Sequence, residues 1–502
     1  EVMPSLMEFL EGAVVVAHNA PFDVGFLNYE LQRLKGRRLG EGAIDTLPLA
    51  RALAPGLPNY RLQTVAEALG SPVGACHRAL ADAQAAGHVF VTLVSRLQEH
   101  DITRLGELRA YLNPSSRTTV EKLGLTRDLP RSPGTYRFLD KDGRTLYIGK
   151  ADRLGERVRS HFVASANHAR KVRQAVRLVE QIDWEETVTP LEAVVHEQRL
   201  ILEHRPSCNL HGTHPETYSY IKAVGGGSGL TLSTTRRAPK WLDDPERAER
   251  PGRQPLVLGP FRGRARLNAA LDLLTRCYPI RRCPRRPDGR PCVRGDRSRC
   301  LAPCSGDPQV RKEHDALVMT IVRWLAGDAH SDLPDPLERA DEVVRSLSRR
   351  QRHEEARSLK EACEHLLSVR RSYASLVEAR RLRFASLWPQ YGNGDGPSVR
   401  LNLVWEGTLR HAVSLDPDAI DDGVASLLEP LWGPSTSPPE ASPLSFVAVP
   451  QSQLDLLLAV RRWFYESDHT PKLPIPGPGS DPAQRRAFKN RLAKEARRVL
   501  LT

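Results

Sequence analysis

The sequence predicts a multidomain protein that combines α/β and α+β folds. Its 502 residues exceed what one hydrophobic core usually organises, which indicates about three domains or more. Residues 1–100 join a short apolar run to helical patterns, and residues 131–212 open with a hairpin signal followed by helical patterns. Cysteines then gather within residues 213–325, and residues 332–372 have a charged helical pattern. Residues 101–130 are expected to be a linker, and residues 373–502 an α+β tail.

Composition and charge narrow the class of partner. With 40% hydrophobic and 26% charged residues, and no apolar run near the roughly 20 residues that span a bilayer, we expect no membrane association. A net charge of +13 favours a polyanionic partner such as DNA. No signal peptide is visible, which favours a cytoplasmic, nucleoid-associated protein. The chain begins at Glu1 without an initiator Met, so we expect the natural N-terminus to lie further upstream.

The first segment places acidic residues at the starts of predicted helices. The β-branched run 13–17 is predicted to be a buried strand, and Asp23 follows it at a strand-to-helix junction. Further along, His77 and Asp82 lie little more than one turn apart, so one helix face can hold both. Helix caps and a surface histidine are the ordinary alternative.

Two stretches of this segment, His18 to Leu27 and His77 to Ala83, resemble the second and third motifs of DEDD-family 3′-to-5′ exonucleases of the DnaQ class, which have an RNase H-like fold. The resemblance implies that Asp23 and Asp82 bind metal in a two-metal site and that His77 is the general base. The family's first motif, Asp-x-Glu, has no counterpart upstream of Val14. We therefore expect a truncated fold, with exonuclease activity only in a longer chain.

The central segment predicts a β-hairpin followed by two helices. The hairpin turn is at Asp142-Gly143, a strong turn signal. The next helix places Arg157 and His161 one turn apart on one face, and a later helix carries Glu197.

This order of residues resembles the GIY-YIG nuclease domain of UvrC and Cho proteins, with Gly134-Thr-Tyr136 and Tyr147-Ile-Gly149 as its two signatures. Thr135 stands where Ile or Val is usual; it is β-branched and suits a strand. Further positions match the family at UvrC-like spacing: Lys150, Arg157, Glu197 and Asn209.

The resemblance implies a catalytic role for these residues, with Mg²⁺ or Mn²⁺ as cofactor. Glu197 would bind the metal, and Arg157 with Lys150 would neutralise the charge that develops on the phosphate. One of the two tyrosines would assist deprotonation of water, and we favour Tyr147 over Tyr136. For an isolated pair of strand tyrosines, simple cross-strand packing is the alternative.

Four cysteines form the pattern C-x8-C-x7-C-x3-C: Cys283, Cys292, Cys300 and Cys304. Clustering of this kind favours a metal site over a disulfide framework, although free thiols remain an alternative. Four thiolates suit structural zinc or an iron–sulfur cluster equally. The neighbouring segments 216–222 and 258–261 resemble UvrC, and that resemblance implies the cluster.

The same region is strongly basic. Residues 262–299 contain twelve arginines and three aspartates, a local charge of +9. We expect DNA contacts here, whereas a solvated basic face without a ligand is the alternative. The candidate contacts are Arg281, Arg282, Arg285 and Arg286.

Residues 332–372 look like a divergent UVR motif, the helical hairpin through which UvrC contacts UvrB; a plain surface helix pair is equally compatible. Beyond residue 373 no motif is recognised. Two strands are expected within 399–413, a loop at 433–443, and a basic amphipathic helix at 481–501.

Taken together, the resemblance implies a DNA-repair endonuclease that makes the 3′ incision of nucleotide excision repair, with UvrB- and UvrA-like partners. The rival hypothesis is a non-catalytic adaptor that binds damaged DNA with nuclease-derived folds. An adaptor has no chemical reason to keep Tyr147, Arg157 and Glu197 together.

Overall fold

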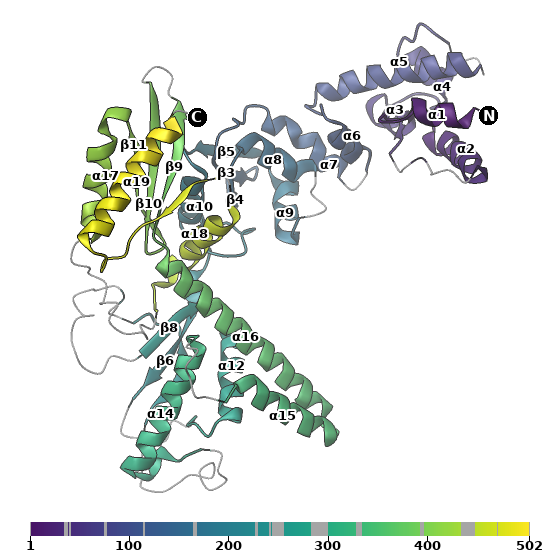
Figure 1. Cartoon of the computed structure of the whole chain (residues 1–502). Coiled ribbons are helices and arrows are strands. Elements are labelled where there is room, and N and C mark those ends of the chain that lie inside the picture. The colour runs from purple at the N-terminus through teal and green to yellow at the C-terminus, as the bar shows by residue number, and fades with distance from the viewer. Residues whose placement is uncertain are drawn as a thin grey trace. The chain divides into compact units, whose positions relative to one another are not determined.

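The computed structural model describes all residues except 1, 35–38, 40–41, 75–77, 114–115, 164–167, 226–228, 240–241, 243–255, 283–299, 328–333, 392–395, 433–446, 469 and 501–502. The chain divides into two compact units (Figure 1). The first contains residues 1–132 and 136–185, and the second contains residues 133–135 and 186–502. Each unit is described separately.

The first unit begins with helices around a very short sheet. The elements are α1 (Met3–Phe9), β1 (Val16–Ala17), α2 (Ala20–Arg33), β2 (Ile44–Asp45), α3 (Thr46–Leu53), α4 (Leu62–Ala68) and α5 (Ala79–Gln98). The expectation of a buried strand over 13–17 is wrong, because only Val16 and Ala17 are paired and Val14 is exposed. The physical reason is that β1 pairs in parallel only with β2, so this sheet has two strands in the described part of the chain.

Residues 101–130, expected to be a linker, contain α6 (Leu105–Leu112), α7 (Arg117–Val120) and the 3-10 helix η1 (Glu121–Thr126). They pack on α8 (Leu154–Val163). Glu107 of α6 accepts hydrogen bonds from Arg159 of α8, and the Thr119 hydroxyl donates to the carbonyl of Phe162 at 3.1 Å. This segment is therefore part of the body that supports α8.

The remainder of the first unit is built on the predicted hairpin. Strands β3 (Gly134–Leu139), β4 (Thr145–Ala151) and β5 (Gln181–Glu186) form a sheet in the order β4-β3-β5. The turn between β3 and β4 includes Gly143 at φ 76°, a backbone conformation that favours glycine. Helices α8 and α9 (Arg170–Leu178) follow β4, and Phe138, Ile148 and Phe162 are fully buried in this part of the unit.

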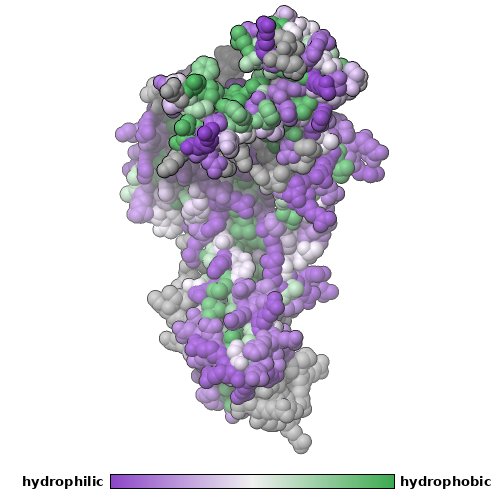
Figure 2. All heavy atoms as spheres, turned by 90° about the vertical axis from the view of Figure 1, so that its right-hand side faces the viewer, coloured by the Kyte–Doolittle hydropathy of each residue, from purple (hydrophilic) through white to green (hydrophobic). Residues whose placement is uncertain are grey.

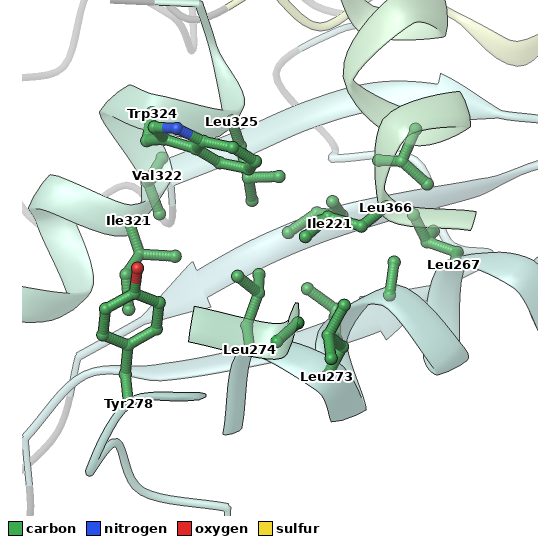
Figure 3. Packing of buried hydrophobic residues seen from close by; sticks show 14 of the residues in the cluster. Ile221, Leu267, Leu273, Leu274, Tyr278, Ile321, Val322, Trp324, Leu325 and Leu366 are labelled. Atoms are coloured by element: carbon green, nitrogen blue, oxygen red, sulfur yellow. The ribbon is translucent and has the colours of Figure 1, made fainter. Parts of the chain in front are cut away.

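The second unit opens with α10 (Pro190–His204) and the 3-10 helix η3 (Pro215–Thr217). A sheet of order β7-β6-β8 follows: β6 (Ser219–Val224), β7 (Thr231–Thr235) and β8 (Leu256–Phe261). Next come α12 (Arg264–Cys277), η5 (Pro303–Ser305), α14 (Pro308–Leu325), α15 (Pro336–Arg349) and α16 (His353–Arg381). Figure 3 shows the core they share, in which Ile221 of β6, Leu274 of α12 and Trp324 of α14 converge.

The helical hairpin expected at 332–372 is present as α15 and α16, although α16 continues to Arg381. Its apolar residues Val344, Leu359 and Leu366 are buried in the same core as α12 and α14. Val343 of the same hairpin is exposed, and the resemblance of the hairpin to a UVR motif stays a prediction.

The C-terminal part is α+β, as expected. Strands β9 (Phe384–Tyr391), β10 (Pro397–Trp405), β11 (Thr408–Leu415) and β12 (Lys472–Pro474) form an antiparallel sheet of order β11-β10-β9-β12. Its helical elements are η6 (Pro417–Ala419), α17 (Ile420–Leu428), η7 (Glu429–Trp432), η8 (Gln451–Gln453), α18 (Leu454–Glu466) and α19 (Pro482–Leu500). The strands expected within 399–413 and the helix expected at 481–501 are confirmed, with Phe488, Leu492 and Ala496 buried. The predicted loop at 433–443 lies outside the described residues.

Polar and charged residues dominate the face of the molecule seen in Figure 2. Among the helices of the described residues, none has the length and apolar character needed to cross a membrane.

Candidate active site

A buried hydrogen bond joins the first signature tyrosine to a histidine. The Tyr136 hydroxyl on β3 lies 2.5 Å from Nε2 of His161 on α8, and both side chains are about 1% exposed. Tyr147 on the neighbouring strand β4 is partly buried, with its ring centroid 6.2 Å from that of Tyr136. The two signature tyrosines are therefore adjacent, and Tyr136 additionally has a hydrogen-bond acceptor in His161.

His161 is held in its neutral form. Burial, followed by the positive charges of Arg157 and His168, lowers the pKa of His161 to about 3. A neutral imidazole has one acceptor nitrogen. In the tautomer with Nδ1 protonated, Nε2 accepts the hydrogen bond that the Tyr136 hydroxyl donates. Among the described residues, Nδ1 of His161 has no hydrogen-bond partner.

The glycine of the second signature has a packing reason. A Cβ atom on Gly149 would overlap the hydroxyl and Cζ of Tyr136, which lies across from it. Only glycine therefore leaves room for the Tyr136 ring at this position. This contact gives a steric reason for glycine at position 149 of the second signature, next to Tyr136 of the first.

The two predicted catalytic cations, Lys150 and Arg157, lie between Tyr147 and His161 in the sequence. Lys150 lies near the end of β4 and is partly buried, whereas Arg157 is exposed on α8, one turn before His161. An exposed guanidinium can receive a phosphate from solvent. The charge of Arg157 adds to the burial that lowers the pKa of His161. The sequence placed Arg157 and His161 on one face but assigned no role to His161; the i, i+4 spacing was the available signal.

The second unit holds the other predicted catalytic residues. Glu197 is partly buried on α10, and Asn209 follows that helix in a loop. The neighbouring His196 contacts Thr135 through Nδ1 and the threonine hydroxyl at 3.2 Å. Thr135, the departure from the family signature, thus has a polar partner.

Glu197 has the chemistry that a hard divalent cation requires. Mg²⁺ and Mn²⁺ prefer oxygen ligands, and Mg²⁺ commonly binds through one or two carboxylates with water and substrate oxygens as the remaining ligands. A single partly exposed carboxylate fits that mode. Across the described residues there is no group of three or more His, Cys, Asp or Glu side chains arranged to hold a metal.

The exonuclease-like residues lie at helix starts, as predicted. Asp23 is exposed in the first turn of α2, and Asp82 is partly buried in the first turn of α5. His77 lies outside the described residues. Asp45 caps α3, because its Oδ1 accepts from the backbone N–H of Leu47 at 2.9 Å and from that of Asn19 at 2.8 Å.

Of the four clustered cysteines, Cys300 and Cys304 are described, and both are buried. The Ala302 N–H donates to the Cys300 sulfur at 3.4 Å, a contact that would stabilise a thiolate. Burial and this N–H···S contact fit a metal-bound cysteine. Cys283 and Cys292 lie outside the described residues.

The arginines proposed to contact DNA differ in exposure. Arg281 is only 8% exposed, so its interpretation as a surface contact is wrong. Its backbone N–H donates to Nε2 of the buried His314, which places it within the packed body. Arg282 is exposed and pairs with Asp272 at 2.6 Å. Arg285 and Arg286 lie outside the described residues.

Three family models match successive stretches of the chain. Residues 1–90 match an exonuclease model, residues 132–210 match the UvrC-like GIY-YIG domain, and residues 231–324 match the middle domain of UvrC/Cho excinucleases. The resemblance predicted from the motifs is thereby confirmed. The chain combines an exonuclease-like segment, a UvrC-like GIY-YIG domain and a UvrC/Cho-type middle domain.

Two curated relatives match parts of the chain. A putative bifunctional exonuclease/endonuclease protein of Mycobacterium tuberculosis is 29% identical over 423 residues, which cover 82% of this chain and 61% of that protein. UvrABC system protein C of Salinispora tropica is 32% identical over 227 residues, or 44% of this chain and 30% of that protein. The chain thus spans less than two thirds of either relative.

A solved structure also matches. The GIY-YIG N-terminal endonuclease domain of UvrC from Thermotoga maritima, bound to magnesium, is 28% identical. The match covers 20% of this chain and 99% of that one, with a TM-score of 0.16.

Proposed function

We propose that this chain is a metal-dependent endonuclease that hydrolyses DNA phosphodiester bonds with its GIY-YIG domain. The observation that carries the proposal is the buried Tyr136–His161 hydrogen bond beside Arg157, in a segment that matches the UvrC-like domain. That match covers Glu197 and Asn209 as well, and it is our reason for assigning residues of both units to one activity.

In the proposed mechanism Tyr136 accepts a proton from the attacking water while its own proton passes to Nε2 of His161. The sequence favoured Tyr147 for this step; the hydrogen bond to a neutral histidine favours Tyr136. Burial is the main cause of the lowered pKa of His161, and a phosphate bound by Arg157 would offset only the smaller contribution of the Arg157 charge.

The remaining residues act on the charge that develops in the transition state. Arg157 and Lys150 stabilise the phosphate oxygens. Glu197 would hold a divalent metal, whose positive charge would supply Lewis-acid stabilisation of the phosphate. Asn209, which lies within the matched residues 132–210, is proposed as a further catalytic residue.

We further infer a role in nucleotide excision repair, with 3′ incision and UvrA- and UvrB-like partners, because relatives of this chain are named UvrABC system protein C. An iron–sulfur cluster at Cys283, Cys292, Cys300 and Cys304 is part of the proposal, with zinc as its alternative. The match to the exonuclease model supports an exonuclease-type role for Asp23, His77 and Asp82.

The decisive experiment is cleavage of damaged and undamaged duplexes in Mg²⁺ or Mn²⁺ by wild type and Glu197→Ala. Cleavage that disappears in the variant supports the endonuclease. Wild-type cleavage by Glu197→Ala in excess Mg²⁺ overturns the assignment and leaves the adaptor hypothesis ahead. For the exonuclease, 3′-to-5′ degradation by this chain that is lost in Asp82→Ala would contradict the expectation that this segment is active only in a longer chain.

A further inference from the structure

The C-terminal sheet contacts the first turn of α10. Thr189 caps this helix, because its hydroxyl oxygen accepts from the Glu192 N–H at 3.2 Å. Arg400 on β10 binds Glu192 in a bidentate manner, with Nε and Nη2 at 2.9 and 3.0 Å from the two carboxylate oxygens. Asn402 donates from Nδ2 to the Thr189 hydroxyl oxygen at 2.8 Å. Strand residues two apart share a face, so Arg400 and Asn402 reach the helix together.

The loop that follows α10 is held by a buried hydrogen-bond network centred on Tyr218. The Tyr218 hydroxyl donates to Oδ2 of Asp455 on α18 at 2.7 Å and accepts from the Gly212 N–H at 3.2 Å. Asp455 is 7% exposed and also pairs with Arg262. Gly212 lies three residues after Asn209, so this buried network holds the loop that carries Asn209.

An apolar contact also joins α10 to the C-terminal part of the chain. Leu191 and Val194 of α10 pack with Phe384, Val404, Val460 and Trp463 of the C-terminal part. Helices α10 and α18 lie side by side in Figure 1. Residues 384–466 therefore contact the start of α10, its apolar face and the loop beyond it.

The polar contacts of α10 fix its orientation in addition to stabilising its packing. A bidentate arginine–carboxylate pair fixes both distance and orientation, and both partners here are less than 20% exposed. Glu197 lies five residues after Glu192, or about 7.5 Å along the helix axis. Any tilt or slide of the first turn is therefore transmitted to the Glu197 carboxylate, and a misplacement of about 1 Å can cost 100-fold in rate.

We propose that Arg400, Asn402 and Asp455 are positioning residues that hold α10 and its following loop so that Glu197 and Asn209 are oriented for the reaction. The inference rests on the proposed function and assigns a role to a part of the chain that carries no nuclease motif. These residues act through Glu192, Thr189 and Tyr218, which they contact directly.

The first test uses Arg400→Ala and Arg400→Lys in the full chain. Direct Mn²⁺ binding without DNA should weaken by roughly 10-fold in Arg400→Ala, in the range seen for residues that orient metal ligands, and less in Arg400→Lys. The metal concentration for half-maximal cleavage should rise in parallel, with cleavage rescued by excess metal. The matched control is Arg380→Ala, which breaks an arginine–glutamate pair of 2.9 Å with Glu406 in the same unit.

The second test addresses the loop. Tyr218→Phe should lower kcat by roughly 10-fold while the ring remains packed. Its control is Tyr220→Phe, which removes a buried hydroxyl that donates to the Val449 carbonyl at 2.8 Å. Equal metal affinity in Arg400→Ala and Arg380→Ala, or equal kcat in Tyr218→Phe and Tyr220→Phe, would overturn the inference. If Glu197→Ala retains wild-type Mn²⁺ affinity, the proposed function fails instead.

Discussion

Arg159 of α8 and Glu107 of α6 form an ion pair that is nearly buried, with 16% and 3% of their side chains exposed. Arg159 also donates to the carbonyl of Asp101. Burial raises the pKa of Glu107, but hydrogen bonds from Arg159 and from the backbone N–H groups of Thr103 and Arg104 outweigh it, so the net pKa is lowered. The pair connects the segment before the GIY-YIG domain to the helix that carries Arg157 and His161.

We expect Glu107→Ala to destabilise the first unit by roughly 3–5 kcal/mol, because it leaves Arg159 buried without its counter-charge. The Glu107 pKa is depressed in the folded protein, so its stabilising contribution is present above the ordinary value near 4.5. That contribution is lost as the pH falls through the folded value. Thermal melts at pH 7 and at lower pH measure both effects. A melting temperature unchanged in Glu107→Ala at pH 7 would contradict the expectation.

Gly149→Ala should displace Tyr136, because the added Cβ would overlap its ring. Overpacking of this kind costs about 1–3 kcal/mol. Cleavage should fall more steeply than stability, since the Tyr136–His161 hydrogen bond is lost. Gly106→Ala is the control, because a Cβ there meets nothing within 4 Å. Equal cleavage rates in the two variants would exclude the steric role of Gly149.

Tyr136→Phe and His161→Phe should each lower the cleavage rate by roughly 100- to 10000-fold, as expected when a general base is removed. DNA affinity should remain near wild type. Tyr147→Phe keeps its ring packing, and its effect on the rate should be smaller. A larger loss in Tyr147→Phe than in Tyr136→Phe would return the base role to Tyr147.

His161 also predicts a pH effect on stability. Its pKa falls to about 3 in the folded protein, so the unfolded chain binds the proton more readily below the ordinary value of 6.5. The favourable contribution of neutral His161 is complete above pH 6.5 and is lost progressively as the pH falls towards 3. Denaturant titrations between pH 7 and pH 4 should therefore show a flatter pH dependence for His161→Phe than for wild type.

Binding and cleavage should separate in Arg157→Ala. The rate should fall by about 100- to 1000-fold, because one cation acts on charge that develops only in the transition state. DNA affinity should change by only a few fold, since it comes from many phosphate contacts that salt weakens together. Salt-dependent binding isotherms and single-turnover cleavage on the same duplex provide the comparison. Parallel losses of affinity and rate would show that Arg157 serves mainly in binding.

Metal analysis of anaerobically purified protein tests the cysteine region. Iron with visible absorption is the expected result, and Cys304→Ser should lose the metal and destabilise the second unit, because metal binding is coupled to folding. Stoichiometric zinc without iron would replace the cluster with a structural zinc site.

The sequence by itself determined the features that depend on residues close together in the chain. The hairpin turn at Asp142-Gly143, the helices of Arg157 and Glu197, and the amphipathic helix with Phe488 and Leu492 follow from turn chemistry and periodicity, which depend on residues close in the chain. The motifs that identify the GIY-YIG and exonuclease-like segments are equally local, and the family matches confirm them.

Tertiary structure decided what depends on residues far apart. The run 13–17 has the composition of a buried strand, but burial requires neighbouring strands and layers that composition does not supply. Arg281 looked like a surface cation until its packing beside His314 became visible. The bond from Tyr136 to His161 and the bidentate contact of Arg400 with Glu192, 208 residues apart, arise where the fold brings distant side chains together and excludes water. No periodicity encodes such pairs, because burial and partner choice are set only when the elements pack.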